Sequence, residues 1–122
     1  MTKDNIRLNI PCKPDYISVV RLTTSAIANN IGLNIDEIED IKVCIGEACV
    51  NVINQNCKDE INIEYGIEAD KLTIKVNNVT NEIKDDDSEN FGEAELGLFI
   101  INSLMDEVNF NEQGINMIKY IE

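Results

Sequence analysis

Histidine and tryptophan are absent from this chain of 122 residues, and cysteine occurs at only four positions. Without histidine, the chain has no base for a Ser-His-Asp or Cys-His catalytic arrangement. The cysteines show no C-x-x-C spacing, and no histidine is present to help bind zinc; they are Cys12, Cys44, Cys49 and Cys57. We therefore expect reduced cysteines with a structural role, of which Cys44 and Cys49 pack as small hydrophobic residues within a helix.

Long apolar runs and basic residues are also scarce. The longest apolar runs are far too short to span a bilayer, and no signal peptide precedes Ile6, which predicts a cytoplasmic protein. Ten basic residues stand against 23 acidic ones, for a formal charge of -13. Because this charge repels phosphate backbones and anionic lipids, we expect neither nucleic acid nor a membrane as a direct partner. A protein with a basic surface is the partner that the charge favours.

The length predicts a single domain over residues 1–122. Alternating apolar residues predict strands at 6–10, 61–67, 72–76, 108–110 and 115–121, and helical spacing predicts helices at 15–31, 34–56 and 95–108. We expect Gly32 to end the first helix. The last helix should be heavily buried through Leu96, Ile100 and Leu104, with Phe99 and Ile101 beside them. The short turn at 68–71 makes the second and third strands an antiparallel hairpin. This order of elements fits an α/β (α+β) two-layer sandwich, in which helices cover one face of a mostly antiparallel sheet.

The helix at 34–56 carries the clearest local signals. Asn34 and Glu37 have the spacing of a capping box, which places the start of the helix. Glu47 and Asn51 lie one turn apart beside its apolar face. A carboxylate and a carboxamide in this position could hold a magnesium ion or activate a hydroxyl. The alternative is that they form the solvated edge of an amphipathic helix.

Two further features concern charge. Arg21 lies in the middle of the helix at 15–31, where it is either a solubilising charge or an anchor for a partner protein. Residues 77–94 hold six acids and one lysine without a regular pattern. Segments of this length are lids, binding loops or disordered regions.

Three blocks of sequence resemble a known family. GEACVN at 46–51 and ELGLFIINSLMDEV at 95–108 resemble the N box and the second glycine box of the GHKL (Bergerat-fold) ATPases. Together with IPCKPDYISVVRLTTSAIANNIG at 10–32, they make nearly the whole chain similar to the anti-sigma factor serine kinases of the RsbW and SpoIIAB type. The resemblance implies ATP and magnesium as cofactors. It also implies a homodimer whose partners are a sigma factor and an anti-anti-sigma protein of the STAS fold.

The resemblance assigns roles to three of the residues already named. Glu47 matches the general base of the family, and Asn51 matches the residue whose carbonyl oxygen binds magnesium. Arg21 matches an arginine of the first helix that contacts partner proteins. A structural interpretation of Asn51 is also open, since its side chain could instead satisfy a backbone group.

The nucleotide-binding positions depart from the family pattern. Asn78 and Thr80 stand where the family has an Asp-x-Gly motif around the adenine. Gly97 and Leu98 match the remaining part of the second glycine box, which shapes the phosphate site. Glu95 replaces one of its glycines and places a carboxylate close to the expected phosphates.

These departures lead to two hypotheses. The first is an anti-sigma-like regulator that binds its partners with weakened or lost nucleotide binding. The alternative is an active ATP-dependent serine kinase that phosphorylates an anti-anti-sigma protein.

Overall fold

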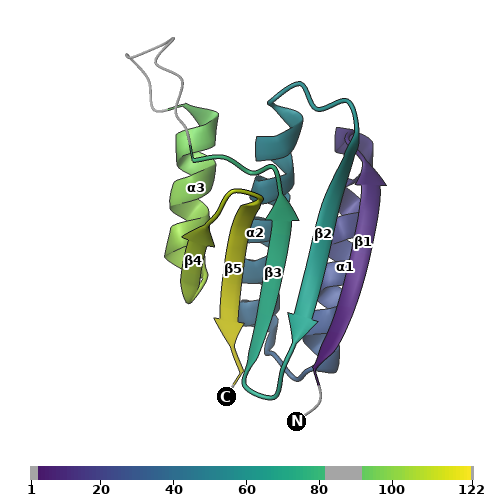
Figure 1. Cartoon of the computed structure of the whole chain (residues 1–122). Coiled ribbons are helices and arrows are strands. Elements are labelled where there is room, and N and C mark those ends of the chain that lie inside the picture. Colours follow the sequence, from purple (N-terminus) through teal and green to yellow (C-terminus); the bar gives the residue numbers. More distant parts are fainter. Residues whose placement is uncertain (1–2, 82–91, 122) are drawn as a thin grey trace.

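The computed structural model of the protein describes residues 3–81 and 92–121 and shows one five-stranded sheet with helices packed on it (Figure 1). The elements in chain order are β1 (Asp4–Pro11), the 3-10 helix η1 (Pro14–Tyr16), α1 (Ile17–Asn30), α2 (Ile35–Ile53), β2 (Glu60–Ile67), β3 (Lys71–Asn77), α3 (Glu93–Leu104), β4 (Glu107–Phe110) and β5 (Gly114–Tyr120). The strand order is β1-β2-β3-β5-β4, and each neighbouring pair is antiparallel. The predicted order of elements and the predicted fold class are confirmed.

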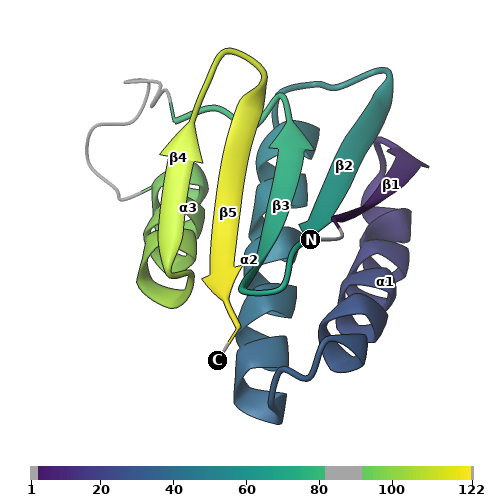
Figure 2. The same cartoon turned by 60° about the horizontal axis from the view of Figure 1, so that its bottom comes forward.

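The helices α1, α2 and α3 all lie on the same face of the sheet (Figures 1 and 2). Alternate strand residues on that face form the core; among them are Ile61, Ile63, Tyr65, Leu72, Ile74, Val76, Ile115 and Met117. On the open face, Glu64 lies between two bases. Its carboxylate oxygens lie 3.1 Å from Arg7 Nε and 3.9 Å from Lys75 Nζ. The alternation in the sequence therefore separates an apolar face from a charged one, as expected for an antiparallel sheet.

The capping box at the start of α2 is present. The backbone N–H of Glu37 donates to Asn34 Oδ1 at 2.8 Å, and the backbone N–H of Asn34 donates to Glu37 Oε1 at 3.0 Å. The helix ends at Ile53, three residues earlier than predicted, because a turn ending at Asn56 follows it. Asn56 has a φ of 59°, a left-handed conformation that asparagine tolerates better than most residues.

The first predicted helix is divided into η1 and α1, and a turn at Gly32, with a φ of 88°, follows it as expected. Inside, Thr24 is buried and joins α1 to the sheet. Its hydroxyl donates to the Val20 carbonyl at 2.7 Å and lies 2.6 Å from the Tyr65 hydroxyl. Because a hydroxyl has one proton, Tyr65 must donate to Thr24 in this arrangement.

The buried face predicted for the last helix is wrong. Leu96 was expected in the core but is 50% exposed, and Phe99 is 63% exposed. Ile101 is buried as expected, and the other buried positions, Gly97 and Met105, lie four residues before and after it. The sequence of α3 is apolar around most of its circumference, so periodicity alone did not determine which side faces the core.

Residues 82–91 form most of the acidic segment predicted as a loop or lid, and they lie outside the described residues. On either side of this segment, β3 ends at Asn77 and α3 begins at Glu93. Among the described residues, no helix is long and apolar enough to cross a membrane.

The prediction of four reduced cysteines is wrong for one pair. Cys12 and Cys57 form a disulfide, with their Cα atoms 6.0 Å apart, whereas Cys44 and Cys49 are free and buried as expected. The pairing of β1 with β2 brings the two residues together, because the N–H of Cys12 donates to the carbonyl of Asp59 at 3.2 Å. A separation of 45 residues hides this proximity in the sequence.

Removing the disulfide should destabilise the fold. A chain-entropy estimate for a loop of 45 residues gives about 4 kcal/mol at 25 °C. We expect the oxidised protein to lose up to this amount of unfolding free energy in the Cys12→Ser/Cys57→Ser variant, measured by urea denaturation. Dithiothreitol should lower the stability of the parent protein similarly and leave the variant unchanged. Four free thiols in the untreated protein would contradict the pairing.

Alkaline pH should also destabilise the protein. Burial raises the pKa of Cys44, Cys49 and Tyr65 to about 12, from the ordinary values of 9.0 for cysteine and 10.0 for tyrosine. The unfolded chain therefore loses these protons first, and the unfolding free energy should fall between pH 9 and 12, by up to about 1.4 kcal/mol per pH unit for each group. In the background without the disulfide, Cys49→Ala should give a shallower slope; an unchanged slope would exclude Cys49 as a contributor.

Candidate functional site

The C-terminal half of α2 and the middle of α3 bring together four of the predicted site residues. Glu47, Asn51, Gly97 and Leu98 line the same hollow between the two helices; Val50, Asn54 and Ile101 complete its lining. The hollow measures about 10 Å³, which is the space of a single water molecule. Residues from the two resembling blocks therefore meet in space, although about 50 positions separate them in the sequence.

Gly97 allows Glu47 to approach α3 closely. A Cβ atom at position 97 would lie 2.8 Å from Glu47 Oε1, closer than such atoms pack. Any larger residue would therefore require the carboxylate of Glu47 to move. Gly97 therefore makes room for the side chain of Glu47.

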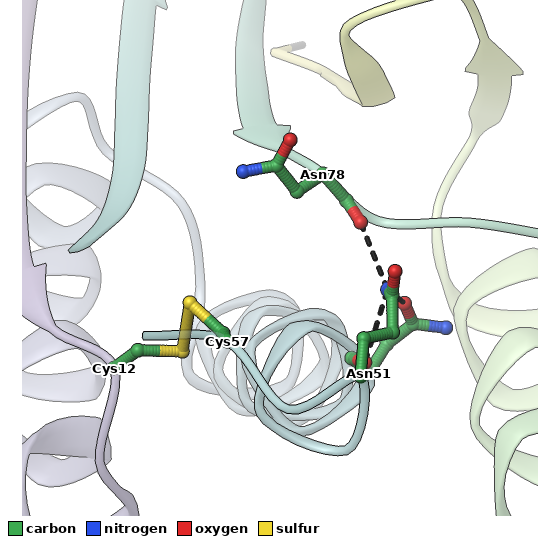
Figure 3. Close-up of a disulfide and its surroundings, with 5 residues drawn as sticks. Cys12, Asn51, Cys57 and Asn78 are labelled. Atoms are coloured by element: carbon green, nitrogen blue, oxygen red, sulfur yellow. Dashed lines mark hydrogen bonds between the residues drawn. A yellow bond between two sulfur atoms is a disulfide. The ribbon is translucent and has the colours of Figure 1, made fainter. Parts of the chain in front are cut away.

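Asn51 is 8% exposed, and its carboxamide is hydrogen-bonded at both ends. Asn51 Nδ2 donates to the carbonyl of Thr80 at 3.0 Å, and Asn51 Oδ1 accepts from the backbone N–H of Thr80 at 3.0 Å. Gln55 Nε2 also donates to Asn51 Oδ1, at 2.9 Å, and lies 2.9 Å from the carbonyl of Asn78. We call Asn51, Gln55, Asn78 and Thr80 the Asn51 cluster. Its bonds attach the segment after β3 to the end of α2 (Figure 3).

The backbone of Asn78, rather than its side chain, takes part in this cluster. Asn78 has a φ of 71°, and its N–H donates to the carbonyl of Gln113 at 2.6 Å. Its side chain points away from Asn51 (Figure 3) and is exposed. The left-handed backbone suits asparagine and brings the following residues, including Thr80, back toward α2.

Arg21 is not part of the hollow. Its guanidinium lies against Gly46, where a Cβ atom would be 2.7 Å from Arg21 Nη2. The same charge lies near Cys49, where it partly offsets the effect of burial, which raises the pKa of that thiol. Gly46 and Glu47 are adjacent in α2, but they point to α1 and to α3 respectively, so α2 separates Arg21 from Glu47.

The sequence alone did not identify Gln55 as part of the site. Its position one turn after Asn51 was a usable signal, because residues four apart on a helix face each other. The close approach of Arg21 to Gly46 had no such signal, since it depends on how α1 and α2 pack together.

The residues present do not fit a magnesium ion as they are arranged. A carboxamide oxygen has two lone pairs, and Asn51 Oδ1 already accepts from Thr80 and from Gln55. A metal ion bound at Asn51 would have to displace at least one of these bonds. Glu47 supplies a carboxylate about one helical turn away, and this single group could provide only part of the oxygen ligands that magnesium requires.

The sequence is similar to a known protein family over nearly its whole length. The family model of the histidine kinase-like ATPase domain matches residues 10–120. The serine-protein kinase RsbW of Bacillus cereus (strain ATCC 10987) is 35% identical over 138 aligned positions, which cover 98% of this chain and 86% of the relative. The serine-protein kinase RsbW of Oceanobacillus iheyensis is 37% identical, with 97% and 87% covered.

The similarity thus extends over nearly the whole length of the chain and most of each relative, and it includes both helices that line the hollow. It confirms the resemblance seen in the three sequence blocks. The chain belongs to the histidine kinase-like ATPase family and, within it, to the group of anti-sigma factor kinases of the RsbW type.

Proposed function

We propose that this protein is an anti-sigma-factor-like regulator of transcription with weakened or lost nucleotide binding. Its partners are a sigma factor, an anti-anti-sigma protein of the STAS fold, or both. The family and the charge of -13 support a basic protein partner. The regulator works in the cytoplasm as a homodimer. Within residues 3–81 and 92–121, β1 is an edge strand whose outer side pairs with no other strand, and this side is available for association.

The Asn51 cluster is the main observation in favour of weakened or lost nucleotide binding. Releasing one buried hydrogen bond of Asn51 costs about 1–3 kcal/mol, which corresponds to a loss of roughly ten- to hundredfold in affinity for magnesium-ATP. The half-buried Glu95 lies in α3 two residues before Gly97 and adds a charge of the same sign as the phosphates. The hydrogen bonds of Asn51 and the charge of Glu95 therefore both lower the expected affinity for magnesium-ATP.

An active serine kinase is the second candidate function. The observation that favours it is that Glu47 and Asn51, at the positions of the family's base and magnesium ligand, line one hollow with Gly97. If nucleotide bound there, Glu47 would be the group to accept the proton of a substrate hydroxyl. Calorimetry and a phosphorylation assay separate the two candidates.

Titration of the purified protein with magnesium-ATP should release no heat, and millimolar ATP should leave its melting temperature unchanged. The variant Gln55→Ala/Asn78→Asp/Thr80→Gly/Glu95→Gly removes one bond to Asn51 Oδ1 through the change at Gln55, and its other three changes restore the residues of the family. We expect this variant to gain measurable binding, because a lone pair of Asn51 becomes available and the carboxylate of Glu95 is removed from the neighbourhood of the expected phosphates, while the carboxylate added at position 78 lies at the expected adenine position.

A micromolar dissociation constant for the unmodified protein would overturn the loss of nucleotide binding. The kinase would then be established if a STAS-domain protein became phosphorylated on serine and the variant Glu47→Ala abolished the reaction. Circular dichroism of Glu47→Ala should match that of the parent, since the side chain is only partly buried.

Arg21→Glu should weaken the complex with the cognate sigma factor or STAS-domain protein at least about tenfold, because arginine anchors often dominate such interfaces. The variant Lys58→Glu makes the same change of charge at another exposed position and should bind within about twofold of the parent. Surface plasmon resonance at two salt concentrations measures the difference. Equal affinities of the parent protein and the Arg21→Glu variant would remove Arg21 from the interface.

A further inference from the structure

A groove runs between the C-terminal half of α1 and the start of α2, two helices that lie side by side (Figure 2). It has a volume of about 410 Å³ and is lined by Leu22, Ser25, Ala26, Asn29, Ile35, Ile38 and Glu39. None of these residues lines the hollow of Glu47 and Asn51. The groove is therefore separate from the candidate nucleotide site.

The groove contains the two most exposed large apolar side chains of the described residues. Ile35 is 79% exposed and Leu22 is 69% exposed. Single exposed apolar residues are common on protein surfaces, but two that line the same concave surface with Ala26 and Ile38 form a contiguous patch. Such patches are typical of surfaces that bind another protein.

The patch is held in place before any partner arrives. Ile35 is the first residue of α2, directly after Asn34, whose side chain and backbone are both bonded to Glu37. Leu33, on the other side of Asn34, is buried in the core. A rigid apolar surface loses little conformational entropy when it binds, which increases its affinity for a fitting partner.

Acidic residues are concentrated in the first turns of α2, which contribute Ile35, Ile38 and Glu39 to the groove. Asp36, Glu37, Glu39 and Asp40 occupy four of the first six positions of α2, and those six positions include no base. Lys42 neutralises one of them, with its Nζ 3.1 Å from Glu39 Oε2. Two copies of the chain meeting at this groove would bring the remaining acids together, so the charge disfavours a second copy as the occupant.

We propose that this groove binds an amphipathic helix of a partner protein. Apolar side chains at a spacing of three and four residues on that helix contact Leu22 and Ile35, and its lysines or arginines lie next to Asp36 and Glu39. The inference rests on the proposed regulatory function for the identity of the partner as a protein. The chemistry expected of the partner helix follows from the groove itself: the helix should have one apolar stripe bordered by basic residues.

A peptide probe tests the groove without a sigma factor or a STAS protein. The probe is a fluorescein-labelled helix of 18 residues, built from leucine on one face and lysine on the other. We expect it to bind the parent protein and to bind Leu22→Ser/Ile35→Ser at least about tenfold more weakly in fluorescence anisotropy. The matched control is Leu96→Ser/Phe99→Ser, which removes two exposed apolar side chains from α3 and should bind like the parent.

Backbone NMR shifts on adding the probe should concentrate at residues 22–29 and 35–39. Equal binding by the parent and by Leu22→Ser/Ile35→Ser would overturn the proposal, as would shifts centred on α3. A dimer that dissociates in Leu22→Ser/Ile35→Ser during sedimentation would also overturn it, since the occupant would then be a second copy. Failure of the peptide leaves the capture of a sigma factor through Arg21 intact, so the two proposals fail separately.

Discussion

The paired hydrogen bonds between Asn51 and the backbone of Thr80 are the constraint on which the site depends. They hold the chain against α2 as it leaves β3, and the left-handed backbone of Asn78 makes this return possible. Gln55 then bonds to both sides of the contact. An unpaired carboxamide buried in this position would be costly, so the bonding of the cluster and the burial of Asn51 require each other.

The residues that match the family's motifs also make contacts within their own chain. The side-chain oxygen of Asn51 accepts two hydrogen bonds from its own chain, and Gly97 accommodates the carboxylate of Glu47. On the opposite side of α2, Gly46 lets the guanidinium of Arg21 lie flat against the helix, in a protein with few cations. The central helix thus has the residues of the hollow on one side and the guanidinium of Arg21 on the other.

Local patterns predicted most of the fold, because capping boxes, turn glycines and strand alternation act between residues close in sequence. The sequence placed Asn34 and Gly32 correctly for this reason. It did not place Leu96 or Phe99, since α3 is apolar on several sides, nor pair Cys12 with Cys57, whose meeting depends on the register of β1 and β2. For the site, the resemblance pointed to Glu47, Asn51 and Gly97. The hydrogen bonds of Asn51 could not be predicted, because they form only where the chain turns back toward α2 after β3.

The disulfide closes residues 12–57 into a covalent ring that contains both α1 and α2. Arg21, the groove at Ile35, Glu47 and Asn51 all belong to this ring, whereas α3 lies outside it. The hollow therefore lies between two differently constrained helices: α2 belongs to the cross-linked ring, whereas α3 packs against α2 from outside the ring. A cut in the chain within the ring would leave its two pieces joined by the disulfide.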